Sequence, residues 1–257
     1  MFSFKNIKIN KAPFPLLMID NFISKKSCIK IKNSILLNKK YDDLVMNGRK
    51  RINKGSDNFK VFINNNKEIK KMYYNLNKIS FFNKINKYLD LYFKDDHWTM
   101  KNKILKFSKK NYGLQKGKKI TKSFDKIKKR NTLNLDIDFS CSENGYFREA
   151  HRDRETRVIN FLLYLNTTKV KEGGKLEIFD LKKNKYKLYS RFPSMKHIVK
   201  KYSLKPVSSR FIFFRSTPNS YHGVSKFNSL HGKRVFLYGS YSLNNKVKWS
   251  NKQSFLK

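Results

Sequence analysis

The sequence predicts an α+β fold that is mainly β, and a change in the spacing of apolar residues carries that prediction. Over the first third of the chain, apolar side chains recur at helical spacing, as at Cys28, Ile31 and Ile35. The second half alternates apolar and polar residues, most clearly over 131–139. A chain of 257 residues is within the size of one β-rich domain. We expect one domain with three parts: a helical flank (1–100), a β core (101–243) and a tail (244–257).

The first hundred residues predict two helices. Residues 12–22 are interpreted as an extended opening segment, after which Ser24 can cap the first helix through its hydroxyl. The stretch 39–66 is polar and contains two glycines and an Asn cluster, which predicts a long loop or a short hairpin. Apolar residues three, four or seven positions apart predict one amphipathic helix over 67–93.

Strands are predicted throughout the second half. Turn signals separate them, notably Gly173-Gly174, Pro206 and Pro218. The Lys-rich segment 108–130 is predicted to be a loop, either solvated or in contact with substrate. The predicted strands are 103–107, 131–139, 146–153, 156–166, 174–180, 185–190, 208–215, 220–224 and 234–242.

The charge balance is strongly basic, with 59 Lys and Arg against 18 Asp and Glu and a net charge of +41. This excludes an acidic disordered protein. The basic residues are mostly Lys and run through the whole chain, so we interpret most of the charge as a compositional habit. A dedicated phosphate-binding surface is the alternative. Hydrophobic residues at 39%, with 22 Phe and 14 Tyr, are enough for a packed interior and exclude intrinsic disorder.

The two cysteines and the short apolar stretches indicate where in the cell the protein is expected to be. Cys28 and Cys141 lack the spacing of a disulfide framework or a zinc site, so both are expected to be buried thiols. No apolar stretch approaches ~18 residues, and prolines interrupt the short apolar run near the N-terminus. We therefore expect neither a membrane span nor a signal peptide, and a cytoplasmic location.

Two histidines and one aspartate predict a metal site. His151 and Asp153 are two residues apart in a predicted strand, so both side chains project from the same face. His222 follows a strand ending at Phe214, and an antiparallel neighbour could bring it to the same point. Two imidazoles and a carboxylate on one side of an ion are typical of a non-haem Fe(II) oxygenase site. The alternative is that these residues are structural or lie on the surface.

Arg234 begins the last predicted strand, where its guanidinium could point into the core. A buried guanidinium needs an anionic partner. One carboxylate of 2-oxoglutarate could supply it through a bidentate contact, while the α-keto acid end chelates the iron. The alternative is a surface arginine of a very basic protein.

Six segments, in order, resemble the prolyl-4-hydroxylase-like 2-oxoglutarate/Fe(II) dioxygenases: GYFREAHRD, RVINFLLYLN, EGGKLEIFD, SRFIFF, YHGV and KRVFLYGSY. The resemblance covers roughly residues 131–243, and PFPLLMIDNFIS resembles the segment that precedes the family's first helix. The resemblance implies a double-stranded β-helix, or jelly roll, with N-terminal helices packed on one outer face.

Carried over residue by residue, the resemblance implies three iron ligands: His151, Asp153 and His222. It makes Arg234 the partner of the distal carboxylate of 2-oxoglutarate and Tyr164 a donor to that carboxylate, with core packing as the alternative for Tyr164. Tyr146 is expected either to face the cosubstrate or substrate, or to have only a packing role in the core. Fe(II), 2-oxoglutarate and O₂ are the implied cofactors, and ascorbate is a further candidate. Phe236 departs from the family, which often has a hydroxyl residue two places after the arginine.

The resemblance implies hydroxylation of an unactivated C–H bond with release of succinate and CO₂. Asp153 favours hydroxylation, because halogenating relatives lack this carboxylate. The substrate stays open among an amino acid, a peptidyl residue and a small metabolite, and an anionic substrate is one option. A nucleic-acid demethylase is disfavoured, because the second arginine of those enzymes is missing from FLYGSYS. A metal-free basic jelly roll that binds nucleic acid is the non-enzyme alternative.

Overall fold

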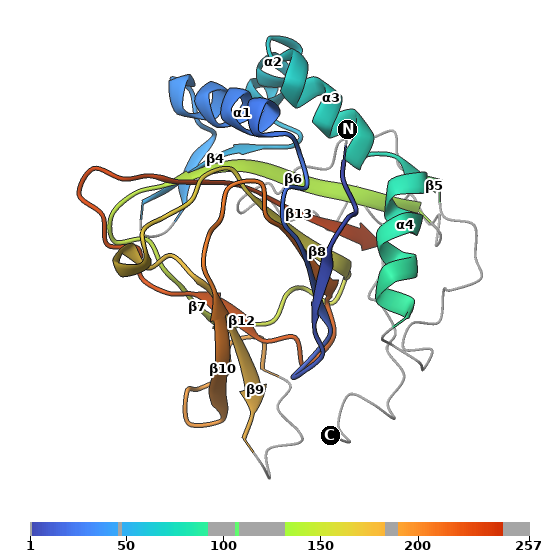
Figure 1. Ribbon diagram of the computed structural model, residues 1–257, viewed down its shortest axis with the longest axis vertical. Helices are drawn as coiled ribbons and strands as arrows, with labels where there is room; N and C mark the ends of the chain where they lie inside the picture. Colours follow the sequence, from blue (N-terminus) through green and yellow to red (C-terminus); the bar gives the residue numbers. More distant parts are fainter. Residues whose placement is uncertain (1, 46–47, 92–105, 108–131, 183–189, 244–257) are drawn as a thin grey trace, which may run out of the picture.

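The computed structural model describes residues 2–45, 48–91, 106–107, 132–182 and 190–243, which form two β-sheets and a set of helices (Figure 1). The larger sheet has nine strands, in the order β1 (Ile7–Asn10), β2 (Leu16–Ile19), β11 (Phe211–Arg215), β8 (Arg157–Tyr164), β13 (Arg234–Leu243), β6 (Thr132–Ser142), β4 (Arg49–Asn53) and β3 (Asp43–Val45), with β5 (Lys106–Phe107) beside β6. The smaller sheet has four: β10 (Ile198–Leu204), β9 (Leu176–Leu181), β12 (His222–Val224) and β7 (Arg148–His151).

Helices cover the larger sheet on its outer side. These are α1 (Lys25–Leu37), α2 (Asp57–Asn64), α3 (Lys67–Leu76) and α4 (Ile79–Asp90). Figure 1 shows α1, α2 and α3 above β4 and β6, and the smaller sheet at the opposite end of the molecule. The predicted double-stranded β-helix with helices on one outer face is confirmed. None of the helices in the described ranges has the length and apolarity needed to cross a membrane.

The alternation of β6 divides its side chains between two layers. Leu133, Leu135 and Ile137 are buried in the core that the sheet forms with the helices. Asp138 alternates with them on the opposite side, where it lines a cavity between the two sheets. The apolar face seen in the sequence is therefore the face under the helices, and the polar face of the same strand points into the jelly roll.

A second core lies between the sheets, and it supports the cavity. Its buried side chains are Phe14, Leu16, Met18, Leu162, Tyr164, Leu176, Ile178, Ile212, Phe214 and Phe236. Most of these come from β2, β8, β9 and β11, so each of these strands contributes to the interior from its inward positions. Leu162, Leu176, Phe214 and Phe236 of this core line the cavity.

The helical predictions are confirmed in part. Ser24 caps α1 by accepting from the backbone N–H of Ser27 at 3.2 Å, as predicted. The prediction of one helix over 67–93 is wrong, because the chain breaks at 77–78 and begins α4 there. The segment 39–66 holds the hairpin of β3 and β4, but also α2, which the sequence reading missed. A side-chain bond from the Ser56 N-cap marks the start of that helix.

Most predicted strands are present, β2 lies in the segment 12–22 that was interpreted only as extended, and β1 and β10 appear in addition. β1 and β10 were not predicted: β1 has only four residues, and β10 alternates poorly and is largely exposed. The predicted strand 185–190 and the loop 108–130 lie almost wholly outside the described residues, as does the tail 244–257. The Gly173-Gly174 turn is confirmed, since both glycines have positive φ, at 71° and 65°. Cys28 and Cys141 are buried free thiols, as expected.

Candidate metal centre

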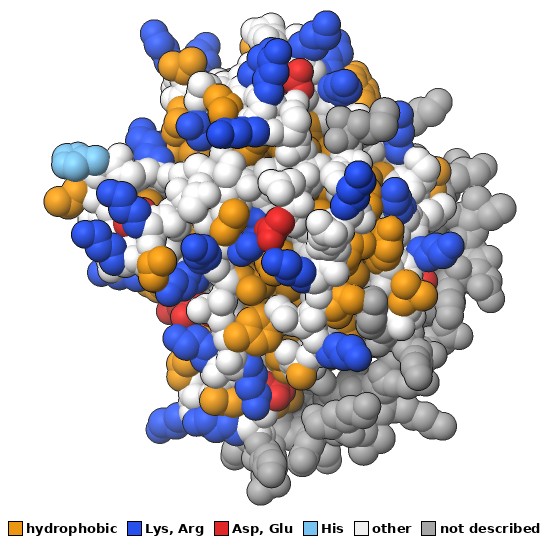
Figure 2. Space-filling view, in the orientation of Figure 1, with side chains coloured by type: hydrophobic (Ala, Val, Ile, Leu, Met, Phe, Trp, Pro, Cys, Tyr) orange, Lys and Arg blue, Asp and Glu red, His pale blue; other side chains and the backbone are white. Residues whose placement is uncertain are grey.

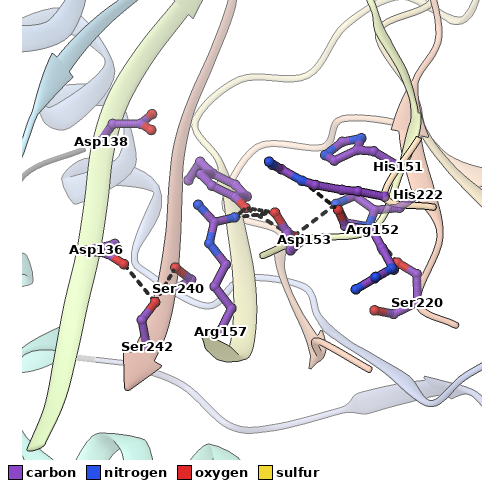
Figure 3. Close-up of polar contacts among 12 residues, drawn as sticks. Asp136, Asp138, His151, Arg152, Asp153, Arg157, Ser220, His222, Ser240 and Ser242 are labelled. Carbon is purple, nitrogen blue, oxygen red and sulfur yellow. Dashed lines mark hydrogen bonds and ion pairs between the residues drawn. The ribbon is translucent and has the colours of Figure 1, made fainter. Parts of the chain in front are cut away.

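The structure brings His151, Asp153 and His222 together. His151 is the last residue of β7, and His222, the first of β12, lies opposite it in the antiparallel register. The potential ligand atoms of the three side chains all lie within 4.8 Å of one another, and all three residues are buried. One detail of the prediction is wrong: Asp153 is not inside the strand but in the loop just after it. Figure 3 shows the three side chains converging from these segments.

Both histidines are oriented for metal binding by their second ring nitrogen. The Nδ1 of His151 donates to the carbonyl of Glu149 at 2.8 Å, and the Nδ1 of His222 donates to that of Ser220 at 2.9 Å. A carbonyl can only accept, so each Nε2 keeps a free lone pair, as in metal-bound histidines. Burial lowers the pKa of His222 and lowers that of His151 to about 3. Both imidazoles are therefore neutral at pH 7, the form that binds a metal.

Asp153 is held as a carboxylate by neighbours that the sequence analysis did not identify. Nη1 of Arg157 donates to its Oδ1, and the hydroxyl of Tyr238 donates to Oδ1 at 3.2 Å and to Oδ2 at 3.3 Å. Burial by itself would raise the pKa of Asp153, but Arg157 and the nearby imidazoles outweigh it and hold this pKa well below its usual range. Oδ2 also lies 3.4 Å from Nε2 of His222, so it faces the histidine pair.

Arg234 is fully buried and has a donor to spare. Its Nε donates to the carbonyl of Gly174 at 2.9 Å, and its Nη2 donates to the Tyr164 hydroxyl at 3.4 Å. Nη1 has no hydrogen-bond partner, and no carboxylate of the described residues pairs with this guanidinium. The ring of Phe236 lies 4.1 Å from its Cζ. A buried cation with an unpaired N–H fits the carboxylate of a ligand.

The two predicted tyrosines flank Arg234. Tyr164 is fully buried, and burial raises its pKa, so its hydroxyl stays protonated and can donate to a ligand while it accepts from Arg234. Tyr146 lines the cavity, and the Cζ of Arg234 lies 5.8 Å from its ring. All six predicted site residues therefore lie in one region of the jelly roll.

One cavity of about 290 Å³ connects the triad to Arg234. Its walls also include groups that sequence reasoning missed, among them Arg49, whose Nη2 donates to Asp138 at 2.5 Å. The alternating polar positions of β6 include Asp138, but alternation by itself does not indicate a role for this residue. The further lining residues are Arg51, Phe147, Arg148, Glu149, Arg154, Arg157, Asn160, Phe161, Leu162, Leu176, Arg191, Phe214, Val224, Phe236 and Tyr238.

The family match among the comparisons with known proteins includes this site. Residues 137–241 match the 2OG-Fe(II) oxygenase superfamily. No curated protein matches the chain. Among solved structures, the chain is similar to a viral collagen prolyl hydroxylase from Paramecium bursaria Chlorella virus 1, with 14% identity over 89% of this chain and 95% of that one and a TM-score of 0.46. It is also similar to a prolyl-4-hydroxylase from Pseudomonas putida, with 12% identity over 89% and 92% and a TM-score of 0.43.

The matched segment contains the three clustered side chains and Arg234. Enzymes of this superfamily use Fe(II), 2-oxoglutarate and O₂, and the donor set of two imidazoles and one carboxylate fits Fe(II). The alternative of a metal-free nucleic-acid-binding module receives no support from the family match. Residues 137–241, which build this site, match the 2OG-Fe(II) oxygenase superfamily, and together with the His-Asp-His cluster this match identifies the protein as a 2-oxoglutarate- and Fe(II)-dependent oxygenase.

Proposed function

We propose that this oxygenase hydroxylates an unactivated C–H bond of an amino acid, a peptidyl residue or a small metabolite. His151, Asp153 and His222 would hold the iron, and Arg234 with Tyr164 would hold the distal carboxylate of 2-oxoglutarate. The bound iron supplies the redox chemistry by which 2-oxoglutarate and O₂ become succinate and CO₂ while one oxygen atom enters the substrate C–H bond. The protein supplies the geometry of the metal ligands, the anchor for the cosubstrate and a pocket that shields the reaction from solvent.

The observation that carries this proposal is the unpaired Nη1 of Arg234 in the same cavity as the His-Asp-His triad. An uncompensated buried guanidinium is costly in the free protein, and a dicarboxylate that spans the cavity would relieve that cost. Asp153 supports hydroxylation over halogenation, because its carboxylate stands where halogenating relatives leave room for chloride.

The chain's own residues set the conditions for this reaction. The carbonyls of Glu149 and Ser220 keep both imidazoles in one tautomer. Phe214 contacts His222 edge-on at 5.0 Å between ring centroids, which limits water around the imidazole. No general base is needed in the protein, since no residue has to accept a proton from the substrate carbon.

The test is an anaerobic titration of the metal-free protein with Fe(II), followed by measurement of succinate release from 2-oxoglutarate in air. We expect one Fe(II) per chain and succinate release that depends on Fe(II). Asp153→Ala should lose most of the Fe(II) binding. Failure of the wild type to bind Fe(II), or equal binding by Asp153→Ala, would overturn the proposal.

A further inference from the structure

Arginine is concentrated in one part of this Lys-rich chain. The sequence has 48 Lys and 11 Arg, yet seven of the arginines and none of the described lysines line the cavity of the triad. On the face shown in Figure 2, Lys and Arg side chains are scattered, with few acidic groups between them. A general preference for Lys does not account for a cavity whose lining basic residues are all arginine. The seven are Arg49, Arg51, Arg148, Arg154, Arg157, Arg191 and Arg234.

Four of the seven have an anionic partner that is already accounted for. Three of them face Asp138 or Asp153, and the fourth is assigned to the cosubstrate. The other three, Arg148, Arg154 and Arg191, have no carboxylate partner among the described residues. Three unpaired guanidinium groups at one cavity are therefore available to a ligand.

Two of the three unpaired arginines, Arg148 and Arg191, lie close to the metal centre, and Arg154 follows Asp153 directly in the chain. Phe192 stacks over His151 with 6.0 Å between ring centroids. The Cζ of Arg148 lies 5.7 Å from the centroid of the Phe192 ring, and that of Arg191 lies 5.2 Å from it. Nε of Arg191 also donates to the carbonyl of Arg152 at 3.2 Å, which fixes its position. Only one aromatic ring separates these two cations from a predicted iron ligand.

Mutual repulsion among these cations is evident at Arg191. Partial burial lowers the pKa of Arg191, and Arg154, Arg157 and Arg148 lower it further, while Asp153 acts in the opposite direction. Arg148 also lowers the pKa of His151, which places its charge within reach of the triad. An anion bound among the three would offset this repulsion.

On the basis of the proposed function, we infer that Arg148, Arg154 and Arg191 form an oxyanion subsite that binds one carboxylate or phosphate of the substrate near the carbon that is oxidised. Guanidinium groups bind both oxyanions bidentately. Two carboxylates limit the subsite to a single anionic group: Glu149 lines the cavity, and Glu149 and Glu177 line an adjoining groove of about 560 Å³. A nucleic-acid backbone carries phosphates in series, so its further phosphates would lie against these two carboxylates and be repelled by them.

The first test is calorimetric titration with sulfate, after Ni(II) and saturating 2-oxoglutarate have been bound. Bound 2-oxoglutarate occupies Arg234, so sulfate cannot bind there. If Ni(II) or 2-oxoglutarate does not bind, that result counts against the proposed function and not against the subsite. We expect the wild type to bind one sulfate, and the Gln variant of all three arginines to bind it at least tenfold more weakly. The control removes three charges from exposed helix positions: Lys26→Gln, Lys30→Gln and Lys70→Gln.

The control should bind sulfate as the wild type does. An equal loss in both triple variants, or no sulfate binding by the wild type, would overturn the subsite. Thermal unfolding checks that the arginine variant is folded, and the single variant Arg154→Gln, at an exposed position, repeats the test with the smallest change.

The second test identifies the source of the anion. Peptides and small acids are supplied in matched neutral, carboxylate and phosphate forms, beside a single-stranded oligonucleotide, and succinate release above the substrate-free rate is measured. Stimulation by the carboxylate or the phosphate form, reduced at least tenfold in the arginine variant, supports the subsite and names its ligand. Strongest stimulation by neutral forms or by the oligonucleotide would overturn it.

Discussion

Arg157 holds the carboxylate of Asp153 from the side opposite the two histidines (Figure 3). The pair is buried, and the hydroxyl of Tyr238 completes the contact by bonding to both residues. Removing one partner from a buried ion pair leaves the other charge uncompensated. The consequence is that Arg157 positions a predicted iron ligand, although it is not itself among the clustered ligand residues.

We expect Arg157→Gln to weaken Fe(II) binding by about 10- to 100-fold, the range for loss of a group that orients a metal ligand. Anaerobic Fe(II) titration measures this. Tyr238→Phe removes only the hydroxyl contact and should have a smaller effect. Arg154→Gln is the control, because Arg154 is exposed and no ion pair joins its guanidinium to the Asp153 carboxylate. Equal Fe(II) affinity in Arg157→Gln and the wild type would show that Asp153 is oriented without it.

Arg234→Leu should weaken 2-oxoglutarate binding by about 2–4 kcal/mol, because a desolvated charge pair loses one partner. Iron binding should survive, since Arg234 is not among the clustered ligands. Calorimetry on the Ni(II)-loaded protein measures the affinity for 2-oxoglutarate. Tyr164→Phe, measured in the same way, should weaken this affinity less than Arg234→Leu does. The wild-type affinity should fall little from low to high NaCl, because the guanidinium is fully buried. An unchanged affinity of Arg234→Leu for 2-oxoglutarate would show that another residue anchors the distal carboxylate.

Gly174→Ala should weaken 2-oxoglutarate binding through Arg234. A Cβ at Gly174 would lie 2.9 Å from Cδ of Arg234, whose Nε bonds to the carbonyl of this same glycine. Gly145→Ala is a matched control, because Gly145 also has positive φ but nothing lies within 4 Å of its added Cβ. Both variants should lose about 1 kcal/mol of stability from backbone strain. Only Gly174→Ala should lose cosubstrate affinity, and a similar loss in both would refute the contact.

The pair of Asp20 and Arg210 predicts a pH-dependent part of the stability. Nε of Arg210 donates to Asp20 at 2.6 Å, and this bond holds the pKa of Asp20 below its usual range. A carboxyl whose pKa is lower in the folded state stabilises the fold above its unfolded pKa of about 4 and loses that contribution as pH falls through the folded value.

We expect Asp20→Asn to reduce the free energy of unfolding at pH 7 by up to about 1 kcal/mol, since the pair is partly exposed. The difference between wild type and variant should shrink as pH falls below about 4. Urea denaturation at several pH values measures it. A difference that stays constant down to pH ~2 would show that Asp20 does not titrate as the contact implies.

The sequence alone determined the class of chemistry and most of the secondary structure. The order of His151, Asp153, His222 and Arg234 indicated the ligands and the cosubstrate partner, because residue type and order along the chain are properties of the sequence itself. Ser24 and the spacing after it predicted α1, since a cap acts within one turn. The break between α3 and α4 was missed, because the apolar spacing continues across it while the backbone does not.

Only the tertiary structure decided which residues support the site. Alternation shows that Leu135 and Asp138 lie on opposite faces of β6, but not that helices cover one face and the cavity the other. The contact of Arg157 with Tyr238 joins residues 81 positions apart, and no local pattern contains it. Likewise, Arg148 and Arg191 meet at Phe192 because β7 and the segment after residue 189 pack together. Such contacts depend on long-range strand register, which the sequence specifies only through the whole fold.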